Sequence, residues 1–205
     1  MNEKLVDFTA DWFTKNIAEF LYHVKPNIKK IESPVGLEIG SYEGLSSRWI
    51  IENILNGDES KLYCVDTWNG SVEHSNFENL DTLESRFMFN LEDHISSGRC
   101  IPIKGMSQDI LPKLMADGKK FDFIYVDGSH NACDVISDAI MSYHLLKEGG
   151  ILCFDDYSWG LKDKRIHEIP HHSIEFFKAM FCANGLLEPL CFNQTAIFKK
   201  IYKPS

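Results

Sequence analysis

Residues 35–47 read VGLEIGSYEGLSS, and the interpretation of the whole chain depends on this stretch. Its apolar start is typical of a buried strand, and Gly40 and Gly44 bracket a turn that leads into a helix predicted over 45–55. Glycine lets a ligand approach the backbone closely, and the first amides of the following helix can donate hydrogen bonds to it. The segment therefore indicates a strand, a tight turn and a helix with a nucleotide site at the turn. The same arrangement occurs in α/β proteins without a cofactor.

The alternation of apolar runs with helix-like periodicity continues through the rest of the chain. Strands are predicted at 61–65, 100–104, 121–126 and 151–154, and helices at 7–24, 77–94, 110–116, 133–146 and 170–182, with a closing hairpin of 186–191 and 195–200. We expect an α/β fold: a single doubly wound, mostly parallel seven-stranded sheet with helices on both faces and a C-terminal antiparallel hairpin. The expected organisation is one domain over 1–205, with a helical cap at 1–30 and a Rossmann-like core at 31–205.

Composition and charge exclude several classes of protein. The chain has 205 residues, a net charge of -9 and a pI near 5.3, which disfavours nucleic acid and anionic membranes as partners. No apolar run approaches the ~18 residues of a membrane span, and no secretory signal is visible. The six cysteines lie far apart without a Cys-x-x-Cys pair, which favours reduced thiols in a cytoplasmic protein. The sequence leaves the oligomeric state open, a homo-oligomer included.

Acidic residues stand in or after four of the predicted strands. Glu38 lies inside the first, and a carboxylate there would repel a pyrophosphate but attract a cationic or hydroxyl-rich cofactor. S-adenosylmethionine (SAM), with its sulfonium, ammonium and ribose, has these properties. Asp66 ends the second strand, where an acid would accept the ribose hydroxyls. Trp68 is expected either to pack on the adenine or to be a core aromatic side chain. Ser107, after the third strand, is expected either at the adenine edge or as a helix cap.

Three more acids, Asp127, Asp155 and Asp156, follow the two strands predicted at 121–126 and 151–154. Because ligands of open α/β sheets bind beyond the carboxyl ends of the strands, these side chains are expected to form a hard oxygen site of the kind that Mg²⁺ favours. His130 follows Asp127 by three residues and suits a general base at neutral pH, whereas a histidine away from such acids is usually structural or exposed.

A second histidine group, His167, His171 and His172, stands near Glu168. A zinc site is disfavoured there, because Pro170 breaks a shared helical face and no other residue completes the ligand set. Residues at the start of a helix or beside the substrate are the preferred interpretation.

These motifs resemble class I SAM-dependent methyltransferases, and in particular the small enzymes of the macrocin O-methyltransferase and catechol O-methyltransferase type. The resemblance spans nearly the whole chain and is carried by LEIGSYEG at 37–44, CVDTW at 64–68, FDFIYVDGSH at 121–130 and LLKEGGILCFDDY at 145–157. The Asp155–Asp156 pair, where the catechol type has Asp-Asn, and His130, where that type has a lysine, favour the macrocin type. The large extra domain of some macrocin-type enzymes is missing, so no macrolide substrate is implied.

The resemblance implies a SAM-dependent O-methyltransferase, assisted by Mg²⁺ or another divalent cation, that acts on a hydroxyl of a small molecule such as a sugar or polyol. Asp127, Asp155 and Asp156 would hold the metal, and His130 and Asp127 would be catalytic. The residues expected at the cofactor are Glu38, Gly40, Ser41, Tyr42, Gly44, Ser46, Asp66, Thr67, Trp68, Ser107 and Asp127.

Three other functions remain open from the sequence. The first is a metal-independent methyltransferase whose acids only position the substrate. The second is an NAD-dependent oxidoreductase, which the missing G-x-G-x-x-G pattern disfavours. The third is a non-catalytic cofactor-binding module, against which the intact acids and His130 argue.

Overall fold

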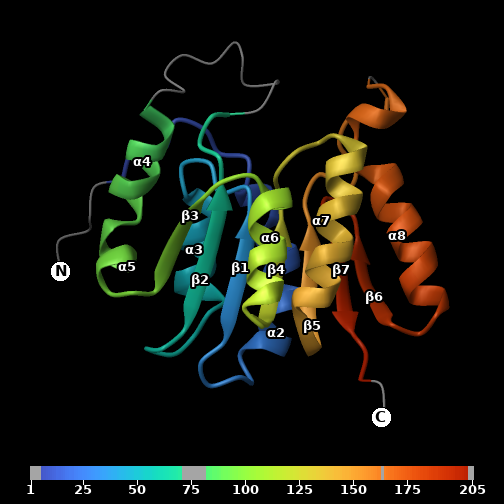
Figure 1. The fold of residues 1–205 in the computed structure, drawn as a ribbon, viewed down its shortest axis with the longest axis horizontal. Coiled ribbons are helices and arrows are strands. Elements are labelled where there is room, and N and C mark those ends of the chain that lie inside the picture. Colours follow the sequence, from blue (N-terminus) through green and yellow to red (C-terminus); the bar gives the residue numbers. More distant parts are fainter. Residues whose placement is uncertain (1–5, 71–81, 163, 203–205) are drawn as a thin grey trace.

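The computed structural model describes residues 6–70, 82–162 and 164–202, and these form one twisted sheet between two layers of helices (Figure 1). The strands of the sheet are β1 (Val35–Ile39), β2 (Lys61–Asp66), β3 (Cys100–Lys104), β4 (Phe121–Val126), β5 (Leu146–Phe154), β6 (Leu187–Phe192) and β7 (Ala196–Lys200). Their spatial order is β3-β2-β1-β4-β5-β7-β6. The first five are parallel, and β7 runs antiparallel to β5 and β6.

Each face of the sheet buries one hydrophobic cluster. One face is covered by α6 (Ser107–Ala116), α7 (Ala132–Leu145) and α8 (His171–Ala183), the last preceded by the 3-10 helix η5 (Ile166–Glu168). The opposite face carries η1 (Thr14–Asn16), α1 (Ile17–Glu19), the π-helix η2 (Phe20–Val24), α2 (Lys25–Ile28), α3 (Leu45–Asn53), α4 (Leu83–Asn90) and α5 (Glu92–Ser96). The predicted fold class, a doubly wound seven-stranded sheet with a C-terminal antiparallel hairpin, is confirmed.

The strand order reverses between β1 and β4, because the chain leaves β1 toward β2 on one side and returns to β4 on the other. The carboxyl ends of β1 and β4 lie together at this point, and the amide of Asp127 donates to the carbonyl of Ile39 at 2.8 Å. Diverging connections leave a crevice at such a reversal, which is where open α/β sheets bind their ligands.

The N-terminal segment differs from its prediction. Helical structure begins at Thr14 rather than at residue 7 and continues to Ile28. Phe20 and Val24 are buried on this helical stretch, and Phe13 is buried just before it, whereas Trp12 is 43% exposed. The helix predicted from residue 7 was therefore wrong over 7–13, although Phe13 packs in the same hydrophobic cluster as Phe20. We call residues 7–13 the N-terminal strap.

Strand β5 also begins earlier than predicted, at Leu146 instead of residue 151. Leu146 pairs with Phe121 and Ile151 with Phe123, so the residues between Leu146 and Ile151 bulge out of the ladder. Gly149, with φ of 77°, allows this bulge. Gly149 and Gly150, which lie between the helix predicted at 133–146 and the strand predicted at 151–154, therefore belong to the strand.

Other predicted elements agree with the structure to within a few residues. The helix predicted over 77–94 corresponds to α4 and α5 for the part that is described, and residues 77–81 lie outside the described residues. Within the described ranges, no helix has the length and hydropathy needed to cross a bilayer.

Candidate active site

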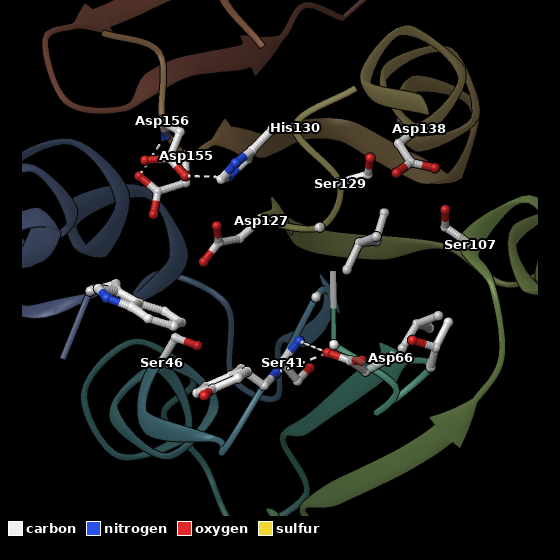
Figure 2. Close-up of a pocket in the computed structure, with 18 of the residues that line it drawn as sticks. Ser41, Ser46, Asp66, Ser107, Asp127, Ser129, His130, Asp138, Asp155 and Asp156 are labelled. Atoms are coloured by element: carbon white, nitrogen blue, oxygen red, sulfur yellow. Dashed lines mark hydrogen bonds and ion pairs between the residues drawn. The ribbon is translucent and has the colours of Figure 1, made fainter. Parts of the chain in front are cut away.

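A cavity of about 640 Å³ opens at the reversal of strand order, beyond the carboxyl ends of β1, β2, β4 and β5. Figure 2 shows its polar side chains arranged around one central space, with Asp155, Asp156 and His130 on one side and Ser107 and Asp138 on the other. Asp66 lies on the opposite wall of the cavity, on the same half of the view as Ser107. The strands thus place the acids predicted from their ends around a single pocket.

The turn after β1 is shaped by contact between two backbones. Gly40 has φ of 84°, and a Cβ atom there would lie 2.1 Å from the carbonyl oxygen of Asp127. No larger residue fits between the ends of β1 and β4, so the glycine leaves the crevice open above the two strand ends.

The carboxylate of Asp66 holds this glycine turn in place. Its Oδ2 accepts hydrogen bonds from the backbone amides of Ser41 at 2.7 Å and Tyr42 at 2.9 Å, and its Oδ1 accepts from the amide of Trp68 at 2.7 Å. Tyr42 and Trp68 both have positive φ values, which these hydrogen bonds help to stabilise. Asp66 therefore links β2 to the turn after β1, a role that the sequence did not indicate.

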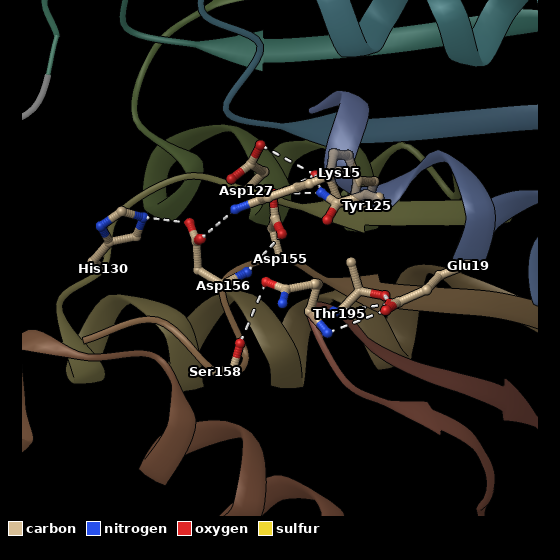
Figure 3. A network of polar contacts seen from close by, with 11 residues as sticks. Lys15, Glu19, Tyr125, Asp127, His130, Asp155, Asp156, Ser158 and Thr195 are labelled. Carbon is tan, nitrogen blue, oxygen red and sulfur yellow. Dashed lines mark hydrogen bonds and ion pairs between the residues drawn. The ribbon is translucent and has the colours of Figure 1, made fainter. Parts of the chain in front are cut away.

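Three carboxylates converge at the other end of the cavity (Figure 3). One oxygen from each of Asp127, Asp155 and Asp156 can be chosen so that all three lie within 4.8 Å of one another. Asp155 is buried, with Oδ2 accepting hydrogen bonds from the Tyr125 hydroxyl at 2.8 Å and from Nδ2 of Asn16 at 2.9 Å. A site with three hard oxygen donors on rigid strand ends fits a divalent cation such as Mg²⁺.

The titration behaviour of the three acids differs. Burial, followed by the charges of Asp155 and Asp156, raises the pKa of Asp127 well above its usual value. Burial and the charge of Asp156 raise the pKa of Asp155 to about 6. Burial alone would raise the pKa of Asp156 as well, but its hydrogen bond with His130 and the nearby charges leave that pKa lowered. Asp156 thus carries the most stable negative charge of the three.

Two cationic or basic side chains contact Asp156. Nε2 of His130 lies 2.8 Å from Oδ2, and Nζ of Lys15 lies 3.1 Å from Oδ1 (Figure 3). The His130 ring also packs against Trp159, with ring centroids 4.3 Å apart. Burial would lower the pKa of Lys15, but the charges of Asp155 and Asp156 raise it, so Lys15 is a protonated ammonium beside the acids.

Most residues predicted at the cofactor line the cavity: Gly40, Ser41, Tyr42, Ser46, Asp66, Thr67, Ser107 and Asp127, together with His130, Asp155 and Asp156. Glu38, Gly44 and Trp68 do not. Glu38 is fully buried and accepts a hydrogen bond from Ser47. The indole of Trp68 packs on Phe87 and donates Nε1–H to the carbonyl of Tyr42 at 3.1 Å, so it does not face an adenine in this structure.

Among the cavity-wall residues that the sequence did not predict are Lys15, Trp12 and Asp138. Lys15 and Trp12 come from the N-terminal region, and no local pattern connects them with the strand ends. Asp138 could have been recognised, because it lies on the buried stripe of α7 with Val135 and Ala139, where an acid is unexpected.

The second histidine group is placed elsewhere. His171 lies at the start of α8, where Nδ1 is 2.9 Å from the carbonyl of Tyr157. Within the described residues, His167, His171 and His172 do not converge with other ligand-type side chains, unlike the three acids. This arrangement agrees with the preference for a helix-start position over a zinc site.

The fold and the pocket define an α/β protein with a cavity and an acidic site at the reversal of strand order. Residues 37–157, more than half of the chain, match the model of a family described as "Methyltransferase domain", and the chain belongs to this family. The predicted class, a SAM-dependent methyltransferase of class I, is thereby confirmed. No curated protein matches the sequence.

Solved structures with the same fold include several methyltransferases. An O-methyltransferase from Bacillus cereus in complex with SAH (S-adenosylhomocysteine) has a TM-score of 0.68 at 14% identity, over 95% of this chain and 84% of that one. The O-methyltransferase TomG from Streptomyces achromogenes, in complex with SAM, has a TM-score of 0.68 at 16% identity, over 97% and 84%. MycE from the mycinamycin pathway, in complex with Mg and SAH, has a TM-score of 0.60 at 17% identity, over 95% and 51%.

Proposed function

We propose that this methyltransferase transfers the methyl group of SAM to a hydroxyl of a small molecule, with a divalent cation at Asp127, Asp155 and Asp156. The observation that carries the proposal is that the three converging carboxylates and the glycine turn border the same cavity. Structures of similar fold are described as O-methyltransferases, and MycE is described in complex with Mg, SAH and mycinamycin VI. A sugar or another polyol is the acceptor class that we propose.

The cofactor would extend along the cavity from the glycine turn. Asp66 would face the ribose, and Ser107 would lie near the adenine, since both line the wall between the turn and α6. The sulfonium would then lie toward Asp127, close to the acids. Positioning of the acceptor oxygen in line with the methyl group accounts for a large part of the rate in such reactions.

The three carboxylates would hold the cation, and the fit rests on their hard oxygen donors and their convergence. When bound, a divalent cation lowers the pKa of a coordinated hydroxyl group. His130 would take the proton of the acceptor hydroxyl. Its hydrogen bond with Asp156 orients the imidazole.

The proposal is tested by binding and by turnover. Calorimetric titration with SAH should show binding, and titration with NAD should show none. Methyl transfer from labelled SAM to a panel of sugars, polyols and catechols should require Mg²⁺ and stop with a chelator. Activity that persists in the chelator would contradict the metal-assisted reaction, and activity only toward nitrogen or carbon acceptors would contradict O-methyl transfer.

One observation favours a second candidate, the metal-independent methyltransferase. The ammonium of Lys15 is 3.1 Å from Asp156 and could balance the charge of the acids without a metal. Lys15→Met separates the two functions. In the metal-assisted enzyme the variant binds Mn²⁺ more tightly, because a competing cation is removed. In the metal-independent enzyme it loses activity in the presence of a chelator.

A further inference from the structure

Asp138 is an acid on the buried stripe of α7 that also faces the cavity. The residue is 2% exposed and lines the cavity wall at the end opposite the three carboxylates. Figure 2 shows its carboxyl group directed from α7 toward the side of the pocket where Ser107 lies. A Ser107 hydrogen bond acts on the carboxyl group, but its Oδ1 is buried without any hydrogen-bond partner.

A buried carboxyl oxygen without a partner costs free energy, so its presence in the wall of a pocket indicates a ligand that supplies the missing donor. Neighbouring polar groups do not supply it. Gln108 donates to Asp134 at 3.2 Å, and Ser129 donates to the same carboxylate at 2.7 Å. The Oδ1 atom of Asp138 is therefore available to accept a hydrogen bond from a molecule bound in the cavity.

The position of Asp138 indicates which part of the occupant it meets. Asp66, which would face the ribose, lies on the same half of the pocket in Figure 2 as Ser107 and Asp138, away from Asp155 and Asp156. The base of the nucleoside must then lie beyond Asp66, beside Ser107 and Asp138. The polar edge of adenine carries an N–H donor at the 6-amino group and an acceptor at N1.

The neutral form of the Asp138 carboxyl group is complementary to the donor and acceptor on this edge of adenine. Burial, and to a smaller extent the charge of Asp134, raises its pKa to about 7 despite the Ser107 hydrogen bond. A neutral carboxyl group has one oxygen that accepts and one O–H that donates. It can therefore accept from the 6-amino group and donate to N1, whereas a carboxylate can only accept.

We propose that Asp138 is a specificity-determining residue that recognises the 6-amino group of the cofactor's adenine through Oδ1. The inference rests on the SAM-dependent function. It assigns to α7 the recognition of the adenine base, whereas among the strand-end acids Asp66 would face the ribose and Asp127, Asp155 and Asp156 would hold the metal.

The test measures discrimination between two ligands rather than affinity alone. SAH and its desamino analogue, in which hydrogen replaces the 6-amino group, are titrated calorimetrically into wild type, Asp138→Leu and Asp138→Asn. Wild type should prefer SAH by about 10–100-fold, because the analogue leaves a buried acceptor unpaired. Asp138→Leu should reduce the preference to less than about 3-fold, and Asp138→Asn, which keeps an acceptor and a donor, should retain it.

Asp117→Asn, an exposed acid at the end of α6, is the matched control and should leave the preference unchanged. A wild-type preference below about 3-fold would overturn the inference without any variant, as would an undiminished preference in Asp138→Leu. Failure of wild type to bind SAH at all would instead contradict the proposed function.

Discussion

Gly40 shows at the scale of one residue how the fold makes room for a cofactor. A methyl group at this position would meet the Asp127 carbonyl, and φ of 84° is unfavourable for any side chain. Gly98 has a similar φ of 74°, but a Cβ there would meet nothing within 4 Å. Substituting each of the two glycines by alanine therefore distinguishes the effect of backbone strain alone from that of strain with a steric clash.

We expect Gly40→Ala to lose about 2–4 kcal/mol of unfolding free energy and most SAH binding, because both strain and a clash result. Gly98→Ala should lose only about 1 kcal/mol and keep its SAH affinity, since it has strain alone. Urea denaturation and calorimetry measure both quantities. Equal losses in the two variants would show that the close approach of β1 and β4 is unimportant.

A second prediction concerns Asp138 and the pH dependence of the free energy of unfolding. Its pKa is about 7 in the folded protein and near 3.8 in an unfolded chain. The folded chain thus binds the proton more tightly, so the stabilising contribution is full below the lower value and is lost as the pH rises through about 7. Asp138→Asn stays neutral, and its advantage over wild type should grow by about 1–3 kcal/mol between about pH 5 and 8. An advantage that does not change with pH in urea denaturation would contradict this assignment.

The third prediction concerns the effect of His130 on the turnover rate. His130→Ala should lower kcat by about 10²–10⁴, the range for a lost general base, and should leave SAH affinity intact. The kcat is measured on the acceptor identified by methyl transfer from labelled SAM. His144→Ala, an exposed histidine at the end of α7, should retain full activity. A folded His130→Ala protein with normal turnover would leave the base unassigned.

The residues of the site differ in how far they could be predicted. Asp66, Asp127 and Asp155 could be placed because each follows an apolar strand, and parallel strands bring their carboxyl ends to one edge. Lys15 could not, because its contact with Asp156 joins positions 141 residues apart. Glu38 was expected at the cofactor, but its side chain is buried against Ser47 of α3. The alternation of side chains along β1 does not reveal which of them face α3 and which face the pocket.

At the scale of elements, the N-terminal strap is attached to the cofactor turn by buried polar groups. The Glu43 carboxylate, 1% exposed, accepts from the Thr9 amide at 2.6 Å and from Arg86. Asn90, fully buried on α4, exchanges hydrogen bonds with the backbone of Asp7 at 2.7 and 2.9 Å and donates to the Glu43 carbonyl at 2.9 Å. The strap, the turn after β1 and α4 therefore form one connected unit.

Asn90→Leu should release the strap without unfolding the sheet. We expect amide exchange over residues 7–13 to become at least about tenfold faster, because each lost hydrogen bond contributes about 1 kcal/mol. Asn184→Leu, an exposed asparagine after α8, is the control and should leave exchange in the strap unchanged. Exchange that accelerates equally over β1 and β4 would indicate global destabilisation instead.

The strap also explains why the first helix was predicted too long. Its aromatic side chains continue the apolar spacing of the helix, but Trp12 packs on Tyr42, with ring centroids 4.9 Å apart, rather than on the sheet. Periodicity reports apolar positions and not the surface that they contact. Helices α3 and α7 were predicted to within a few residues, because the side chains that each of them buries follow the helical period.

At the scale of the whole molecule, the order of strands in the sheet brings the carboxyl ends of β1, β2, β4 and β5 together with the strap around one cavity. The order of elements could be predicted from alternating patterns, and the reversal between β1 and β4 from the class of fold. Which surface the N-terminal residues cover depends on long-range packing and required the structure.

The central claim is that the acids beside the cofactor pocket hold a divalent cation, and Mn²⁺ binding to the SAH-saturated protein tests it most directly. Titration followed by the electron paramagnetic resonance signal of free Mn²⁺ should show a single site that Mg²⁺ displaces. Asp155→Asn should weaken it by about 10–100-fold, in line with the loss of a charged ligand. A protein that binds SAH but leaves all the Mn²⁺ free, in wild type and in Lys15→Met alike, would contradict the claim.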